Sequence, residues 1–233
     1  MPFTRHGYRD IAMGTLAFFL IILVSLWAYR HYGTTWAVAP PIFLTPFYGW
    51  LLWFFRDPER SIADVPGCLV SPADGVITHL DEADEPEFIA GRARRLSIFL
   101  SVLDVHINRM PAAGGVVFRK SRPGTYFDAR REESLAKNRN QDVGLLPDDS
   151  LLPGKLLVRQ STGAIARNIV CPVEVGGRFA RGERYGMIKF GSRTTLFLSK
   201  DREIEWLVKI GDRVKAGETV VARAVNPVRS STC

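Results

Sequence analysis

The feature that most constrains the fold is an uncharged apolar run near the N-terminus. This run, IAMGTLAFFLIILVSLWAY, covers residues 11–29 and is about long enough to cross the core of a bilayer as a helix. A cleavable signal peptide would be followed by a small-x-small cleavage site, but a second apolar stretch at residues 34–55 follows instead. We therefore predict that residues 1–56 form a membrane anchor with two apolar segments.

The second segment carries three prolines, so it suits either a membrane helix or a kinked, re-entrant element. Arg5 and Arg9 precede the first segment, and Arg56 and Arg60 follow the second. The positive-inside rule then favours a hairpin with both ends in the cytoplasm, and places the main domain on the cytoplasmic side of the cell (inner) membrane. If the second segment does not cross, the domain lies on the opposite side.

Charge and cysteine content narrow the class of protein. The formal net charge is +7, and most basic residues lie beyond residue 55. Because a membrane anchor is present and the basic residues do not alternate with aromatic ones, the charge favours an anionic membrane over nucleic acid; a merely soluble basic surface is the alternative. Cys68, Cys171 and Cys233 are too far apart for a disulfide framework or a metal cluster, and the four histidines are too scattered for a metal site.

Residues 57–233 read as many short strands separated by glycine-rich turns, which predicts a mainly β domain: a compact β-sandwich or barrel-sandwich. The polar stretch at residues 128–144 is expected to be a short helix or a mobile loop. The stretch Val208–Ala222, VKIGDRVKAGETVVA, resembles the hairpin of biotinyl and lipoyl carrier domains. No turn with a modifiable lysine accompanies it, so the resemblance supports the barrel-sandwich topology rather than a carrier function.

Two short stretches place reactive side chains beside apolar strands. In SPADG, Asp74 lies in a tight turn, where it is either a functional carboxylate or an ordinary turn former. In FLSVLDVHINRMP, His106 follows a strongly apolar strand. It is either a general base or a core residue satisfied by one hydrogen bond.

A third stretch, KFGSRTTLFL at residues 189–198, has Gly191 and Ser192 within an apolar strand pattern, or between two abutting strands. The G-x-S-x-G motif of hydrolases is absent. A serine hydroxyl can, however, attack the preceding carbonyl, and a glycine leaves that carbonyl open and tolerates the strained backbone. β-Elimination and hydrolysis then convert the serine to a pyruvoyl group. The attack needs a base, which a histidine oriented by a carboxylate would supply.

Taken in order, FFRDPER (residues 54–60), SPADGVI, FLSVLDVHINRMP and KFGSRT resemble the phosphatidylserine decarboxylase family. The short chain, the apolar N-terminal hairpin and the GSR motif are similar to its compact prokaryotic type. The resemblance covers most of the domain and implies decarboxylation of a membrane phospholipid, phosphatidylserine, to phosphatidylethanolamine and CO2. Archaetidylserine is the alternative substrate.

The resemblance also implies self-cleavage between Gly191 and Ser192. The products would be an associated β chain, residues 1–191, and α chain, residues 192–233. The covalent cofactor would be a pyruvoyl group derived from Ser192, which forms a Schiff base with the substrate, and no metal is required. Asp74 and His106 match catalytic residues of the family.

One position departs from the family pattern. Many members have a second histidine where this chain has Arg109. His106 would then serve maturation, decarboxylation or both, and Arg109 would bind the carboxylate or phosphate of the substrate.

Two other classes of protein remain as alternatives. A membrane-anchored barrel-sandwich adaptor accounts for the anchor but not for the three motifs together. A Ser-His-Asp lipid hydrolase would use Ser192, His106 and Asp74 and would keep its chain intact. No nucleic-acid partner is expected, and a homo-oligomer is compatible with the sequence.

Overall fold

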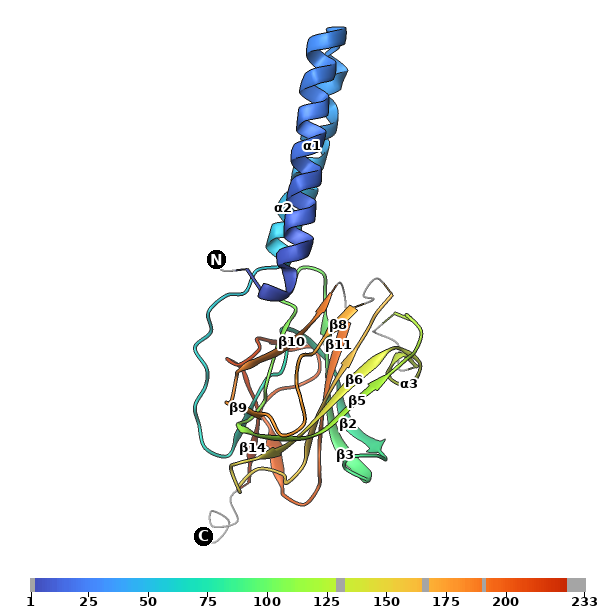
Figure 1. Ribbon diagram of the computed structural model, residues 1–233. Coiled ribbons are helices and arrows are strands. Elements are labelled where there is room, and N and C mark those ends of the chain that lie inside the picture. The colour runs from blue at the N-terminus through green and yellow to red at the C-terminus, as the bar shows by residue number, and fades with distance from the viewer. Residues whose placement is uncertain (1–2, 129–132, 165–167, 190–191, 226–233) are drawn as a thin grey trace. The chain divides into compact units, whose positions relative to one another are not determined.

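The computed structural model describes residues 3–128, 133–164, 168–189 and 192–225, and the chain divides into two compact units, Met1–Pro58 and Glu59–Cys233 (Figure 1). The helices are η1 (Arg5–Gly7), α1 (Tyr8–Tyr32), η2 (Thr35–Val38), α2 (Ala39–Phe54) and α3 (Ser134–Lys137). The strands are β1 (Cys68–Val70), β2 (Gly75–Glu85), β3 (Gly91–Leu100), β4 (Ile107–Arg109), β5 (Gly114–Arg122), β6 (Asn140–Pro147), β7 (Leu156–Ser161), β8 (Asn168–Val170), β9 (Arg178–Phe179), β10 (Arg184–Lys189), β11 (Ser192–Leu198), β12 (Ile204–Trp206), β13 (Arg213–Val214) and β14 (Val220–Ala224).

The N-terminal unit is a hairpin of α1 and α2. The hydroxyls of Thr15 and Tyr48 are 2.9 Å apart, and the Phe18 and Tyr48 rings stack with centroids 4.6 Å apart. Gly14 lets the helices approach closely, because a Cβ at this position would lie 2.3 Å from Leu51 Cδ2. The second apolar segment forms a helix that continues through its internal proline, Pro46.

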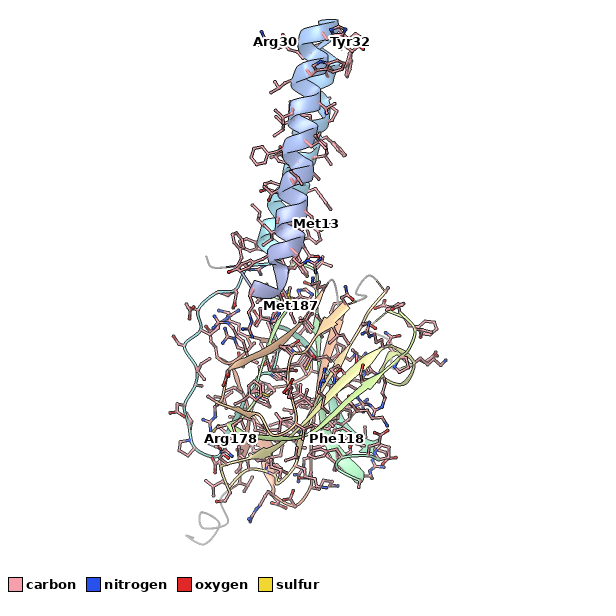
Figure 2. All side chains as sticks on the ribbon, viewed as in Figure 1. Met13, Arg30, Tyr32, Phe118, Arg178 and Met187 are labelled. Carbon is pink, nitrogen blue, oxygen red and sulfur yellow. The ribbon has the colours of Figure 1, made fainter. Side chains whose placement is uncertain are left out.

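Both helices are long and apolar enough to cross a membrane, judged by length and composition. Their large apolar side chains are mostly exposed rather than buried against protein, as lipid-facing side chains would be. Figure 2 shows Arg30 and Tyr32 at the end of the pair that is remote from Met13. The exposed apolar residues of the two helices include Met13, Leu16, Phe19, Leu20, Leu23, Val24, Leu26, Trp27, Ile42, Phe43, Phe47 and Trp53.

The C-terminal unit is a layered antiparallel β structure. Its largest sheet has eight strands in the order β13-β2-β3-β11-β7-β6-β5-β9. Two three-stranded sheets, β1-β14-β12 and β4-β10-β8, contribute side chains to the same hydrophobic core as the central strands β3, β11 and β7. The prediction of a mainly β sandwich-like domain with an N-terminal helical hairpin is therefore confirmed.

Strand β6 lies in the polar stretch that the sequence assigns to a helix or a loop. Only the short α3 precedes it there among the described residues. The strand begins with three buried polar residues, Asn140, Gln141 and Asp142, a composition that is unfavourable for strands in general. Asp142 is satisfied by Arg159 of β7, whose Nε and Nη2 donate to its two oxygens at 2.7 and 2.9 Å. Tertiary pairing thus overrides local propensity.

The hairpin expected over Val208–Ala222 differs in the structure. Its first strand, β13, pairs with β2, so that Arg213 faces Val76. Its second strand, β14, pairs with β1 and β12 in another sheet. The two strands of the motif therefore join two sheets of the sandwich instead of pairing with each other.

Candidate active site

Ser192 is the first residue of β11 and pairs with Leu100 of β3 in the middle of the large sheet. It is fully buried, and its Oγ has no hydrogen-bond partner among the residues that the structure describes. The preceding strand, β10, ends at Lys189 and belongs to another sheet, so the chain changes sheets just before Ser192. In that other sheet, β10 pairs with β8. Gly191 lies outside the described residues.

Two hydrogen bonds hold the strands on either side of this junction against the segment that contains His106. The backbone N–H of Ile188 in β10 donates to the His106 carbonyl oxygen at 3.3 Å. Asn108 Nδ2 donates to Thr194 Oγ1 of β11 at 3.0 Å. The structure therefore brings His106 and Ser192, which are far apart in the sequence, to the same junction.

The His106 ring is fully buried and is oriented by a backbone group. Its Nδ1 lies 2.9 Å from the carbonyl oxygen of Asp104. Because a carbonyl oxygen only accepts, Nδ1 must carry a proton, and the lone pair of the neutral ring is then on Nε2. His106 thus has the tautomer that a general base acting through Nε2 requires.

Asp74 is a largely buried carboxyl whose two oxygens accept hydrogen bonds. The backbone N–H of Ala216 donates to Oδ1 at 2.8 Å, and Arg60 Nη2 donates to Oδ2 at 2.7 Å. Burial raises the pKa of Asp74 above its usual value, and the nearby charge of Asp104 acts in the same direction, while the Ala216 and Arg60 contacts oppose both. The partners of Asp74 are therefore a main-chain amide and an arginine.

Asp104 interacts with both of these predicted site residues. Its carbonyl oxygen orients His106, and its carboxylate influences the pKa of Asp74. The backbone N–H of Ser101 donates to its Oδ2 at 2.8 Å, and Arg213 Nη1 lies 3.4 Å from its Oδ1. Sequence reasoning did not assign Asp104 or Arg60 to the site, although DVH and FFRDPER contain them.

Arg109 is buried at the end of β4. Its Nη1 donates to the carbonyl oxygen of Gly182 at 2.8 Å, and its backbone N–H donates to that of Pro72 at 3.0 Å. These bonds give Arg109 a packing role between two turns. The expectation that it binds the substrate stays a prediction.

The site fits a cofactor made from the chain itself. Ser192 is shielded from water, its hydroxyl has no partner in the described parts of the chain, and His106 carries a proton on Nδ1, as a base acting through Nε2 does. Within the same described residues, no group of three or more His, Cys, Asp or Glu side chains could hold a metal ion. The chemistry that this arrangement supports is attack by the serine hydroxyl, assisted by a histidine.

Comparison with known proteins identifies the family. Residues 47–222 match the sequence profile of phosphatidylserine decarboxylase. A phosphatidylserine decarboxylase proenzyme of Rhodopirellula baltica is 40% identical over 224 residues, covering 96% of this chain and 88% of the relative. The proenzyme of Symbiobacterium thermophilum is 47% identical over 173 residues, covering 74% and 78%. That of Geotalea uraniireducens is 36% identical over 220 residues, covering 94% and 95%. The chain thus belongs to the phosphatidylserine decarboxylase family, as its motifs predict, and it is a decarboxylase enzyme.

Proposed function

We propose that this enzyme decarboxylates phosphatidylserine with a pyruvoyl group that it makes from its own Ser192, and releases phosphatidylethanolamine and CO2. The family supports the reaction, and the proenzyme names of the relatives support processing of the chain. The observation that carries the proposal is the buried, unpartnered hydroxyl of Ser192 at the start of a central strand, which Asn108, two residues after His106, contacts through Thr194. A serine held for a structural purpose would have its hydroxyl satisfied.

Maturation begins when Ser192 Oγ attacks the carbonyl carbon of Gly191. His106 Nε2 accepts the hydroxyl proton, and the Asp104 carbonyl stabilises the charged ring through Nδ1. The peptide C–N bond breaks, the amino group of residue 192 takes up the proton, and an ester remains. β-Elimination then removes the Cα proton of residue 192 and breaks its Cβ–O bond, so that Gly191 leaves as a carboxylate. The resulting dehydroalanine tautomerises, adds water and releases ammonia, which leaves the pyruvoyl group.

A pyruvoyl carbonyl at position 192 would take up the amine of the substrate and accept the electron pair released as CO2 departs. The protein supplies the surroundings. Burial of Ser192 and His106 excludes water from the reacting atoms, which strengthens each electrostatic interaction there. Arg60 and the Ala216 amide favour the ionised form of Asp74 against the cost of burying it.

The two chains produced by cleavage would stay associated. Strand β11, which opens the α chain, has all seven of its residues buried and pairs with β3 on one side and β7 on the other. Further along the α chain, β14 pairs with β1. Because these ladders join the α chain to the β chain without a covalent link, cleavage leaves the sheets intact.

The anchor suits a substrate that never leaves the bilayer. Two apolar helices precede the domain, and the basic residues beside them favour a cytoplasmic position at the inner membrane. The net positive charge adds attraction to anionic lipid such as phosphatidylserine.

Intact mass spectrometry of the purified protein tests the proposal, together with an assay of phosphatidylethanolamine formed from phosphatidylserine in micelles. We expect two chains that meet at the 191/192 junction, an α chain with a pyruvoyl N-terminus, and release of CO2. Ser192→Ala should give one full-length chain without activity. A wild-type chain that stays whole after long incubation and is labelled by a serine-directed phosphonate would instead indicate a lipid hydrolase. Archaetidylserine, assayed in parallel, tests the backbone preference.

A further inference from the structure

A chain of buried side chains lies beside Ser192, on the same face of the large sheet. Asn108 Nδ2 donates to the Pro72 carbonyl oxygen at 3.4 Å and to Thr194 Oγ1 at 3.0 Å. Gln160 Nε2 donates to Asn108 Oδ1 at 2.8 Å. Asn108, Thr194 and Gln160 are all fully buried. None of them belongs to the predicted catalytic set.

The backbone fixes the orientation of both amides. A carbonyl oxygen such as that of Pro72 only accepts, so the Asn108 amide must turn its Nδ2 toward it and its Oδ1 toward Gln160. Gln160 then has to present its Nε2 to Asn108. This leaves Gln160 Oε1 as a hydrogen-bond acceptor, and it has no partner among the described residues.

An unfilled acceptor at this place is costly, because a buried polar atom without a hydrogen bond has lost its contact with water and gained no partner. Gln160 faces Thr194 in the β7–β11 register, and Ser192 is two residues before Thr194 on the same face. Diagonal neighbours of this kind have Cα atoms roughly 7–8 Å apart. Gln160 Oε1 and Ser192 Oγ are thus two unpartnered buried polar atoms on adjacent positions of one surface.

A ligand that fits Gln160 Oε1 is a hydrogen-bond donor, and its position next to residue 192 points to a group that reacts there. The group that reacts there in the proposed function is the primary amine of a phosphoserine headgroup, whose neutral form has two N–H donors and a lone pair that attacks the carbonyl. The Gln160 amide oxygen can accept a hydrogen bond from one N–H of this neutral amine, which leaves the lone pair for the carbonyl and buries no unpaired charge. We infer that Gln160 binds the amino group of the substrate through Oε1 and that Asn108 is the positioning residue that holds Gln160 in this orientation.

The inference rests on the proposed function, so its test separates capture of the substrate amine from the presence of the cofactor. The processed full-length protein in detergent micelles is treated with phosphatidylserine and a borohydride reductant, and the mass gain of the α chain is followed with time. In a second reaction, hydroxylamine reports the reactive carbonyl without any headgroup contact. Wild-type protein that reacts with neither reagent refutes the pyruvoyl proposal itself.

Gln160→Met keeps the length of the side chain but removes the acceptor. We expect capture of phosphatidylserine, at concentrations below its KM, to slow about tenfold, as loss of one good hydrogen bond predicts. The hydroxylamine reaction should stay unchanged. Gln160→Glu, while its carboxyl is protonated, keeps both an acceptor and a donor to Asn108 Oδ1, so it should restore most of the capture at a pH low enough to protonate it. The effect should fall mainly on KM rather than on kcat.

Gln141→Met is the matched control, because Gln141 faces Gln160 from β6, one strand further from Ser192. Its Nε2 donates to two backbone carbonyl oxygens, and we expect no selective loss of capture in this variant.

If Gln160→Met is not processed, Asn108→Asp takes its place. The carboxylate of this variant cannot donate to the Pro72 carbonyl oxygen, so the same selective loss of capture is expected. If the reactions with phosphatidylserine and with hydroxylamine slow equally, Gln160 and Asn108 have only a structural role. If capture of phosphatidylserine is unchanged, Gln160 Oε1 accepts from water and not from the substrate.

Discussion

Arg60 Nη2 lies 2.7 Å from Asp74 Oδ2, and both side chains are mostly buried, at 7% and 12% exposure. The same guanidinium reaches Glu218 Oε2 through Nη1 at 3.3 Å. One arginine therefore joins the SPADG turn to the segment between β13 and β14. At such low exposure the pair is shielded from solvent, and loss of Arg60 would leave Asp74 as a largely buried carboxylate without its cationic partner.

The first prediction concerns the pH dependence of self-cleavage. The pKa of Asp74 is raised mainly by burial, and Arg60 opposes this shift. If cleavage needs ionised Asp74, its rate falls as the pH drops through that raised pKa. Arg60→Gln removes an interaction that lowers the pKa, so the acid limb of the profile should move to higher pH. Asp74→Asn cannot ionise, so its cleavage should be slow at every pH and show no such limb.

Newly translated proenzyme, sampled by gel electrophoresis across a pH series, provides this measurement. The matched control is Arg92→Gln, which breaks an exposed pair with Glu82 and should leave the limb in place. A limb that does not move in Arg60→Gln would show that the ionisation of Asp74 does not limit cleavage.

The second prediction assigns the maturation base. His106→Gln keeps a polar side chain but removes the basic nitrogen, so cleavage should slow by about 10²–10⁴-fold. The rate is measured as the appearance of the α chain by intact mass. His79→Gln, the same change on β2, should be processed at the wild-type rate. Normal processing of His106→Gln would leave decarboxylation as the remaining catalytic role for His106.

The third prediction concerns the turn that carries Asp74. Gly75 has φ of 151°, and a Cβ at this position would lie 2.1 Å from the Phe99 carbonyl oxygen. Gly75→Ala should therefore destabilise the domain by about 3 kcal/mol or more, through strain and a clash with backbone. Gly91, at the start of β3, has no atom within 4 Å of the same ideal position. Gly91→Ala should change stability by less than about 1 kcal/mol.

Thermal unfolding of both variants in the Ser192→Ala background measures this difference without interference from cleavage. Equal melting temperatures for Gly75→Ala and Gly91→Ala would mean that β2 and β3 can separate locally at no cost. The close approach of the two backbones would then not determine the position of Asp74.

The parts of the site that are predictable from the sequence are those with a local signature. The Gly-Ser dipeptide inside an apolar strand pattern and the turn residues around Asp74 mark unusual backbone in a single stretch. The contacts of Arg60 with Asp74 and of Asn108 with Gln160 span 14 and 52 positions in the chain. They depend on sheet register, which a single sequence does not specify. For the same reason β6 is recognisable only once Arg159 is known to lie opposite Asp142.

The last prediction compares two neighbouring threonines of β11 that differ in the face they occupy. Thr194 and Thr195 are both fully buried. Thr194 Oγ1 accepts from Asn108 on the face that carries Ser192, whereas Thr195 Oγ1 lies 3.1 Å from Ser97 Oγ on the opposite face. Replacement of either by valine keeps the shape and removes one hydrogen bond, at a cost of about 1 kcal/mol in each case.

The two variants should therefore have similar melting temperatures but different chemistry. Thr194→Val frees the Asn108 amide that ties β4 to β11 beside Ser192, so cleavage should slow severalfold, while Thr195→Val should mature normally. The half-time of α-chain appearance, measured alongside thermal unfolding, distinguishes the two. Equal half-times at equal stability would show that the buried polar chain on the Ser192 face contributes only to packing. A selective delay in Thr194→Val would show that the geometry of the cleavage junction depends on this face of the sheet.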